Sequence, residues 1–284
     1  MKYTIATCMS ALMTGLLSLS IQAQTLKTPA PSPLASIKQS FGLGDITVDY
    51  SRPSVKGRVI FGDLVPYGKA WRTGANAATK ITFTDDVMIE GTPVKPGTYA
   101  LYTIPNKDSW EIILNNDLTL GGNIAGYKPE NEIVHVTVVP TSLTEKVELF
   151  TINIADVTTT SATLELIWDK VRVPVKITTE IDAKVMKNIE TSLATDTRPY
   201  FQSASYYYDN NKDLNQALIW VNKAIEQNPK AFWMTMLKAR IELKLKDNKS
   251  AIASAEKTKA LAIEAKNDDY VKMADALIAS ANKK

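Results

Sequence analysis

Residues 87–104 have the sequence Val-Met-Ile-Glu-Gly-Thr-Pro-Val-Lys-Pro-Gly-Thr-Tyr-Ala-Leu-Tyr-Thr-Ile, and this stretch decides the fold. A short apolar run ends in turn-forming residues 90–93, and a second turn at Pro96-Gly97 leads into a run rich in β-branched and aromatic residues. Gly and Pro at such short intervals leave no room for an amphipathic helix between the runs. The stretch therefore predicts short strands connected by tight turns.

Similar apolar runs flank this stretch on both sides. They cover residues 46–50 and 80–83 upstream, and 110–114, 133–139, 147–154, 162–168 and 171–177 downstream. Many short strands without an intervening helix predict an all-β sandwich or barrel-like domain over residues 34–181. Asp169 lies between the last two runs, and we expect it in a hairpin turn that joins them.

The spacing of apolar residues changes near Asp182. Six amphipathic patterns predict helices over residues 182–193, 199–208, 214–227, 231–245, 250–265 and 268–281. Residues that cap or stop helices separate several of these patterns, as at Asn228-Pro229 and Asp247-Asn248. An all-α domain is therefore predicted over residues 182–284.

Small residues recur in this helical segment. Ala217 is followed by Val221, Ala224 and Pro229 at offsets of four, seven and twelve, and by Ala251 at an offset of 34. A 34-residue period with small residues, which let paired helices approach closely, resembles tetratricopeptide repeats. The pattern predicts one good and one degenerate repeat with flanking helices. A generic bundle of helical hairpins is the alternative.

The N-terminal residues are typical of export. Lys2 precedes an apolar, uncharged run from Ile5 to Ile21, and Ala23 supplies the small residue before a cut at Gln24. This pattern predicts a signal peptide over residues 1–23, followed by a Pro-rich linker over 24–33. We expect a protein in the periplasm or on the outer surface of a Gram-negative bacterium, without a membrane span once it is mature.

Composition narrows the classes of partner and cofactor. Of 33 basic side chains only Lys2 would leave with the signal peptide, so 32 remain against 30 acidic ones. Such a balance gives no electrostatic reason to expect nucleic acid or an anionic membrane as a partner. The single cysteine, Cys8, lies inside the signal peptide, so the mature chain has no thiol for a disulfide or a metal site. No cofactor and no metal are predicted.

Residues 50–80 form the segment most suggestive of a binding site. Six basic side chains accumulate there against Asp63 alone, and four glycines divide the segment into loops. Guanidinium groups suit planar anions, and aromatic rings such as Tyr67 can stack on a sugar. We predict an anionic or carbohydrate ligand at five candidate residues: Arg52, Arg58, Trp71, Arg72 and Asn76. The alternative is structural, with Trp71 in the core and the arginines bonded to loop carbonyls.

Catalytic chemistry has weaker support. His135 is the only histidine, and its place in Val-His-Val-Thr-Val (residues 134–138) predicts a position on a sheet face or at the surface. One imidazole without thiols does not make a usual zinc site, and the chain contains no Gly-x-Ser-x-Gly motif for a nucleophile. No catalytic residue is therefore predicted.

The basic segment also carries a resemblance to a known family. Tyr-Ser-Arg-Pro (residues 50–53), Lys-Gly-Arg (56–58), Trp-Arg-Thr-Gly-Ala-Asn (71–76) and Pro-Gly-Thr-Tyr-Ala-Leu-Tyr (96–102) are similar to motifs of the domain of unknown function family 2911, DUF2911. The similarity covers residues 34–177. It implies an exported bacterial protein, in some members with a repeat-like helical tail, and it implies no activity.

These features favour a non-enzymatic binding or interaction protein. The β domain would bind a small anionic or carbohydrate ligand, and the helical tail would contact a protein partner. Two alternatives stay open, namely a hydrolase that uses a carboxylate pair on a polysaccharide and a structural envelope protein.

Overall fold

The computed structural model describes residues 28–120, 124–195 and 198–283. The predicted signal peptide and the first four residues of the predicted linker lie outside these ranges. The chain divides into two compact units. The first contains the strands, and the second contains residues 178–284 together with the short tips at 41–43 and 158–161.

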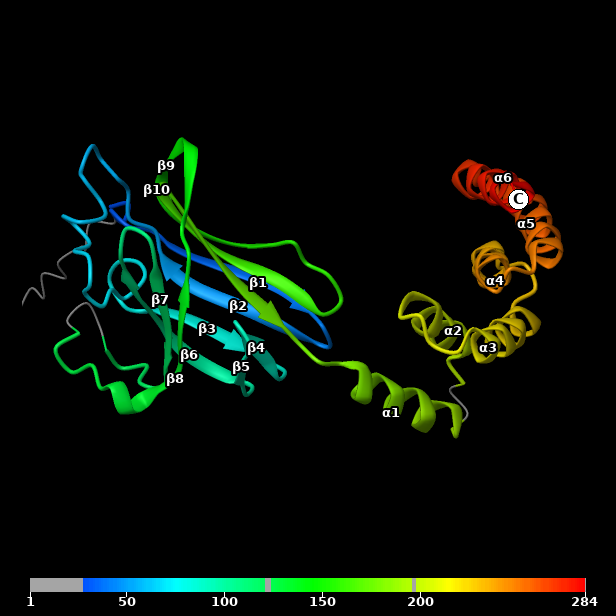
Figure 1. Ribbon diagram of the computed structural model, residues 1–284, viewed down its shortest axis with the longest axis horizontal. Coiled ribbons are helices and arrows are strands. Elements are labelled where there is room, and N and C mark those ends of the chain that lie inside the picture. The colour runs from blue at the N-terminus through cyan, green and yellow to red at the C-terminus, as the bar shows by residue number, and fades with distance from the viewer. Residues whose placement is uncertain (1–27, 121–123, 196–197, 284) are drawn as a thin grey trace, which may run out of the picture. The chain divides into compact units, whose positions relative to one another are not determined.

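The first unit consists of two antiparallel sheets, which confirms the predicted β-rich domain (Figure 1). One sheet has the strand order β1-β2-β3-β6-β7-β8, and the other has the order β5-β4-β10-β9. The strands are β1 (Leu34–Phe41), β2 (Gly44–Ser51), β3 (Thr79–Phe83), β4 (Val87–Ile89), β5 (Thr92–Val94), β6 (Gly97–Pro105), β7 (Trp110–Asn115), β8 (Glu132–Val138), β9 (Thr141–Ala155) and β10 (Ser161–Thr178).

The hairpin expected at Asp169 is wrong. β10 continues from Ser161 to Thr178 and pairs with β9 on both sides of Asp169, where the register shifts. The backbone of Asp169 is left-handed, with φ of 53°. An Asp in this conformation is common in turns, but here Asp169 lies within a continuous strand, and β9 contributes the extra residues at the register shifts on either side of it.

Aromatic side chains fill the core between the sheets. Trp71 and Trp168 are stacked, with ring centroids 5.8 Å apart and planes inclined by 16°. Phe150 meets Trp71 edge-on at 5.2 Å, and Phe61 meets Trp110 edge-on at 5.0 Å. Large rings in offset or edge contact contribute both buried apolar area and specific geometry. This cluster therefore joins residues from both sheets and from the loop that carries Trp71.

The second unit is helical, as predicted. Its helices are α1 (Asp182–Leu193), α2 (Tyr200–Asp209), α3 (Leu214–Gln227), α4 (Phe232–Lys244), α5 (Asn248–Glu264) and α6 (Asp268–Asn282). Side chains cap the N-termini of α3, α5 and α6. The Asp213 carboxylate accepts hydrogen bonds from two backbone N–H groups of α3. Asp247 accepts one from α5, and Asn267 accepts one from α6. Among the described residues, no helix has the length and apolarity needed to cross a membrane.

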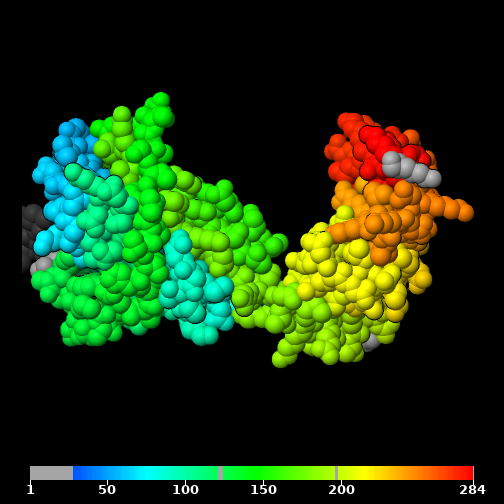
Figure 2. Space-filling model, in the orientation of Figure 1, coloured from blue at the N-terminus to red at the C-terminus, as the bar shows by residue number. Residues whose placement is uncertain are grey.

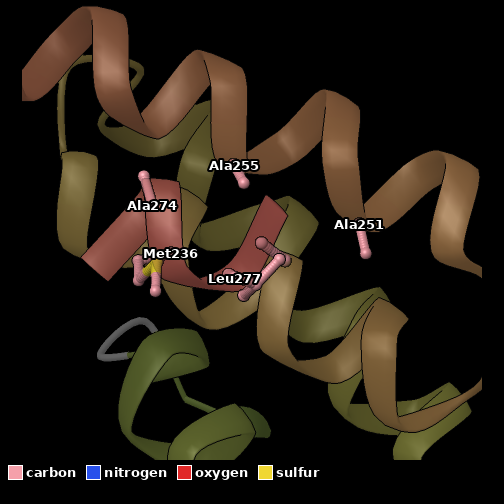
Figure 3. Packing of buried hydrophobic residues seen from close by; sticks show 6 residues of the cluster. Met236, Ala251, Ala255, Ala274 and Leu277 are labelled. Carbon is pink, nitrogen blue, oxygen red and sulfur yellow. The ribbon is translucent and has the colours of Figure 1, made fainter. Parts of the chain in front are cut away.

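Alanines allow the later helices to pack closely. Met236 and Ala239 of α4, Ala251 and Ala255 of α5, and Ala274 and Leu277 of α6 form one buried cluster (Figure 3). Ala217 and Ala251, which are 34 residues apart, are both fully buried. Helices pack mainly on their neighbours in sequence, so the colours of α2 to α6 follow one another in chain order over the surface (Figure 2).

Candidate functional site

The structure places Arg52 and Arg58 against the protein's own backbone. Arg52 donates through Nε to the carbonyl oxygen of Phe150 at 3.0 Å and through Nη2 to Oγ1 of Thr151 at 2.8 Å. Arg58 donates to two carbonyl oxygens of its own loop, three and four residues upstream, at 3.1 and 2.5 Å. The two guanidinium groups therefore hold the loop that follows β2, and the ligand predicted for them stays a prediction.

Trp71 and Asn76 also have partners within the fold. Trp71 is buried in the aromatic core, and its indole N–H donates to the carbonyl oxygen of Gly74 at 3.0 Å. The Asn76 amide donates to the hydroxyl of Ser51 at 3.2 Å. Burial lowers the pKa of Arg72 below the usual value for arginine. The five predicted residues thus lie in one loop region. Several of them form hydrogen bonds within the protein that hold this region in shape.

A small pocket opens beside this region. It has a volume of about 70 Å³, and Phe61, Tyr67, Asn106, Lys107 and Trp110 are among its lining residues. Tyr67, which the sequence suggested as a stacking ring, is more than a third exposed there.

The outer face of the six-stranded sheet carries a polar chain that sequence reasoning missed. Nδ1 of His135 lies 2.7 Å from Oε2 of Glu132, and Nε2 lies 2.6 Å from Oε2 of Glu111. The hydroxyl of Tyr127 donates to the other oxygen of Glu132. The predicted sheet-face position of His135 is confirmed. The pairing of Ile113 with His135 brings Glu111 close, and such a register cannot be read from local sequence.

The two carboxylates favour a charged imidazole at position 135. Burial lowers the pKa of His135, but hydrogen bonds and charge attraction from Glu111 and Glu132 outweigh burial and raise the pKa above 6.5. A raised native pKa means that protonation stabilises the folded state. This stabilisation is complete below the unfolded-state pKa and disappears as the pH rises through the higher native pKa.

We therefore expect the melting temperature of His135→Gln to approach that of the unsubstituted protein as the pH rises from 5.5 to 9. The deficit of the variant should be largest at pH 5.5, where the imidazolium binds both carboxylates. Thermal unfolding at half-unit pH intervals measures this trend. A deficit that is independent of pH would show that His135 acts by packing alone.

Side chains of α2, α4 and α6 line a groove on the helical unit. It has a volume of about 310 Å³. Its lining residues come from α2 (Phe201, Ser205, Tyr208 and Asp209), α4 (Trp233, Met236, Leu237 and Arg240) and α6 (Tyr270). In Figure 1, α2, α4 and α6 lie on one side of this unit, and α3 and α5 lie on the other. Spacings of three, four and seven residues along α4 place its four lining residues on one helix face.

Aromatic contacts hold the groove walls in place. Phe232 meets Trp233 edge-on at 5.1 Å and Tyr270 edge-on at 4.8 Å. The Lys244 ammonium lies 4.6 Å from the centroid of the Tyr208 ring, and it donates to the Tyr208 carbonyl oxygen at 3.1 Å. Lys244 thereby satisfies a carbonyl in the last turn of α2, where helix carbonyls lack intrahelical partners.

The fold and these sites define a protein with a two-sheet unit followed by a helical unit. Residues 32–177 match the family described as Protein of unknown function (DUF2911), and the chain belongs to this family. The match ends one residue before the end of β10, so it covers the strands and leaves the six helices outside. The tetratricopeptide resemblance of the tail therefore stays a prediction. Neither the curated proteins nor the solved structures contain a match to this chain.

Proposed function

We propose that this chain is an exported interaction protein whose helical unit binds a segment of another protein. The groove on α2, α4 and α6 carries the proposal, because aromatic, Met and Arg side chains line it together. These residue types are enriched where proteins meet, and Trp, Tyr and Arg contribute a large share of the binding energy there. Trp233 is 37% exposed although its ring is large and apolar.

The groove's size is suited to a short peptide segment. A volume of about 310 Å³ lies at the lower end of the range for ligand sites, and its walls belong to helices, which hold side chains more rigidly than loops do. A segment that inserts two or three side chains would cover the exposed rings. For the two-sheet unit, we propose that the loop region after β2 binds an anionic or carbohydrate ligand.

A peptide selection tests the proposal. A displayed library of random 12-residue peptides is selected on the full chain, and the affinity of each selected peptide is then measured with variants. We expect Trp233→Ala to weaken binding at least tenfold, because Trp is enriched among the few interface residues whose truncation costs about 2 kcal/mol or more. Ile219→Ala is the control, since Ile219 is 50% exposed on α3. Equal affinities for both variants would contradict a site in the groove.

Export is tested separately. When the chain is produced with its own N-terminus in a Gram-negative host, we expect the protein from the periplasmic or outer fraction to begin at Gln24. Mass spectrometry of the intact protein measures this directly. A cytoplasmic protein that retains residues 1–23 would refute the signal peptide.

A further inference from the structure

We propose that the segment bound in this groove presents the carboxylate of an Asp or Glu side chain to Arg240, next to an apolar side chain. The inference rests on the proposed function and names the chemistry of the partner. An extended protein segment with an acidic residue beside an aliphatic or aromatic one would fit.

Arg240 lacks the partner that its chemistry favours. Its Nη2 lies 3.7 Å from Sδ of Met273, which is a weak acceptor. Within residues 28–120, 124–195 and 198–283, no carboxylate forms an ion pair with Arg240, whereas several lysines of the helical unit are paired. These pairs are Lys212 with Asp182, Lys230 with Glu264, Lys238 with Glu242, and Lys259 with Asp275. A guanidinium binds a carboxylate through two parallel hydrogen bonds. A carboxylate of the partner would accept this pair of bonds from Arg240, which no carboxylate of the described residues does.

The rings around Arg240 would strengthen such a contact. Tyr208, Trp233 and Tyr270 line the same groove, and a segment seated among them would displace water from the guanidinium. Coulomb attraction grows as the local dielectric constant falls, so a carboxylate held there interacts more strongly than one at an open surface. The same rings need an apolar side chain to cover them, which is why the acid and the apolar residue are proposed as neighbours.

Other charges near the groove determine which charge the bound segment carries and how many acidic residues it has. Lys244 lies one turn beyond Arg240 on α4, and its ammonium is held at the Tyr208 carbonyl. Asp209 also lines the groove. A basic segment would meet both cations, whereas a segment with several acids would meet Asp209. The arrangement therefore favours one carboxylate, placed at Arg240.

The selected 12-residue peptides test this inference when they are synthesised with amidated C-termini, so that only side chains supply carboxylates. We expect them to share an Asp or Glu next to an apolar residue. Binding should weaken at least tenfold in Arg240→Gln, and equally when the peptide's acid is changed to the amide. The two changes together should cost no more than either alone, as a direct contact requires. Lys257→Gln, an exposed position on α5, should bind normally.

Each contrary result has a distinct meaning. Peptides that need Trp233 but bind Arg240→Gln normally would overturn the carboxylate inference and leave the proposed function standing. Basic peptides, or peptides that bind only with a free C-terminal carboxylate, would also overturn it. If no selected peptide depends on Trp233, both the inference and the proposed function fail. Circular dichroism of Arg240→Gln at 222 nm should match that of the unsubstituted protein, which shows that the variant is folded.

Discussion

Trp168→Ala is expected to destabilise the two-sheet unit by about 3–5 kcal/mol, the range found when a buried aromatic residue is truncated. Trp168 is 2% exposed and stacks on Trp71 at 5.8 Å. Its ring also meets Phe150 and Phe61 edge-on, at 5.8 and 6.2 Å. Removing it would open a cavity among rigid rings, which have few alternative rotamers with which to refill the space.

Urea unfolding followed by near-ultraviolet circular dichroism measures this loss, because that signal reports packed aromatic side chains. Leu34→Ala is the control. Leu34 lies on β1 with 75% of its surface exposed, so its truncation should change the unfolding free energy by no more than about 0.5 kcal/mol. If Trp168→Ala behaved like this control, the aromatic cluster would not be the core of the unit.

The second large effect is expected from overpacking, with Ala255→Leu costing about 1–3 kcal/mol in the helical unit. Ala255 of α5 is fully buried among side chains of α4 and α6 (Figure 3). A leucine there requires the helices to separate or neighbouring side chains to leave their rotamers. The backbones are close because position 255 carries a small side chain.

Ala253→Leu separates this steric effect from helix propensity. Ala253 lies on the same helix two residues away, and it is exposed. Both changes carry the same small loss of propensity, so their difference in melting temperature, followed at 222 nm, measures the packing cost. A midpoint for Ala255→Leu equal to that of Ala253→Leu would mean that the three helices do not pack as closely as Figure 3 shows.

The helices could be predicted almost to the residue because their signals are local. Apolar periodicity and capping residues decide where such a helix begins, and Asp213 and Asn267 accept the backbone N–H groups expected of caps. The stretch around residues 87–104 was also informative, because turns there separate β4, β5 and β6. The first turn is shorter than predicted, since Thr92 and Pro93 pair with β4 as part of β5. These features need no knowledge of distant parts of the chain.

The predictions from sequence were wrong or incomplete where contacts with a distant segment of the chain determine the local structure. Asp169 resembles a turn residue, but pairing with β9 continues on both sides of it and keeps it within β10. β1 was not predicted, because among its side chains only Phe41 is buried and it borders the sheet through one neighbour. Edge strands bury little, so their sequences carry a weak apolar alternation.

The sequence by itself determined the family, the β-rich and helical units, and the basic loop region with its arginines and Trp71. The tertiary structure decided the use of these side chains: Arg52 meets a carbonyl some hundred residues away, and Trp71 stacks on Trp168. It also assembled the groove around Arg240 from three helices that are not consecutive in sequence. Composition specifies which groups are available, but binding depends on which of them meet in space, and that depends on strand register and helix packing over long separations in the chain.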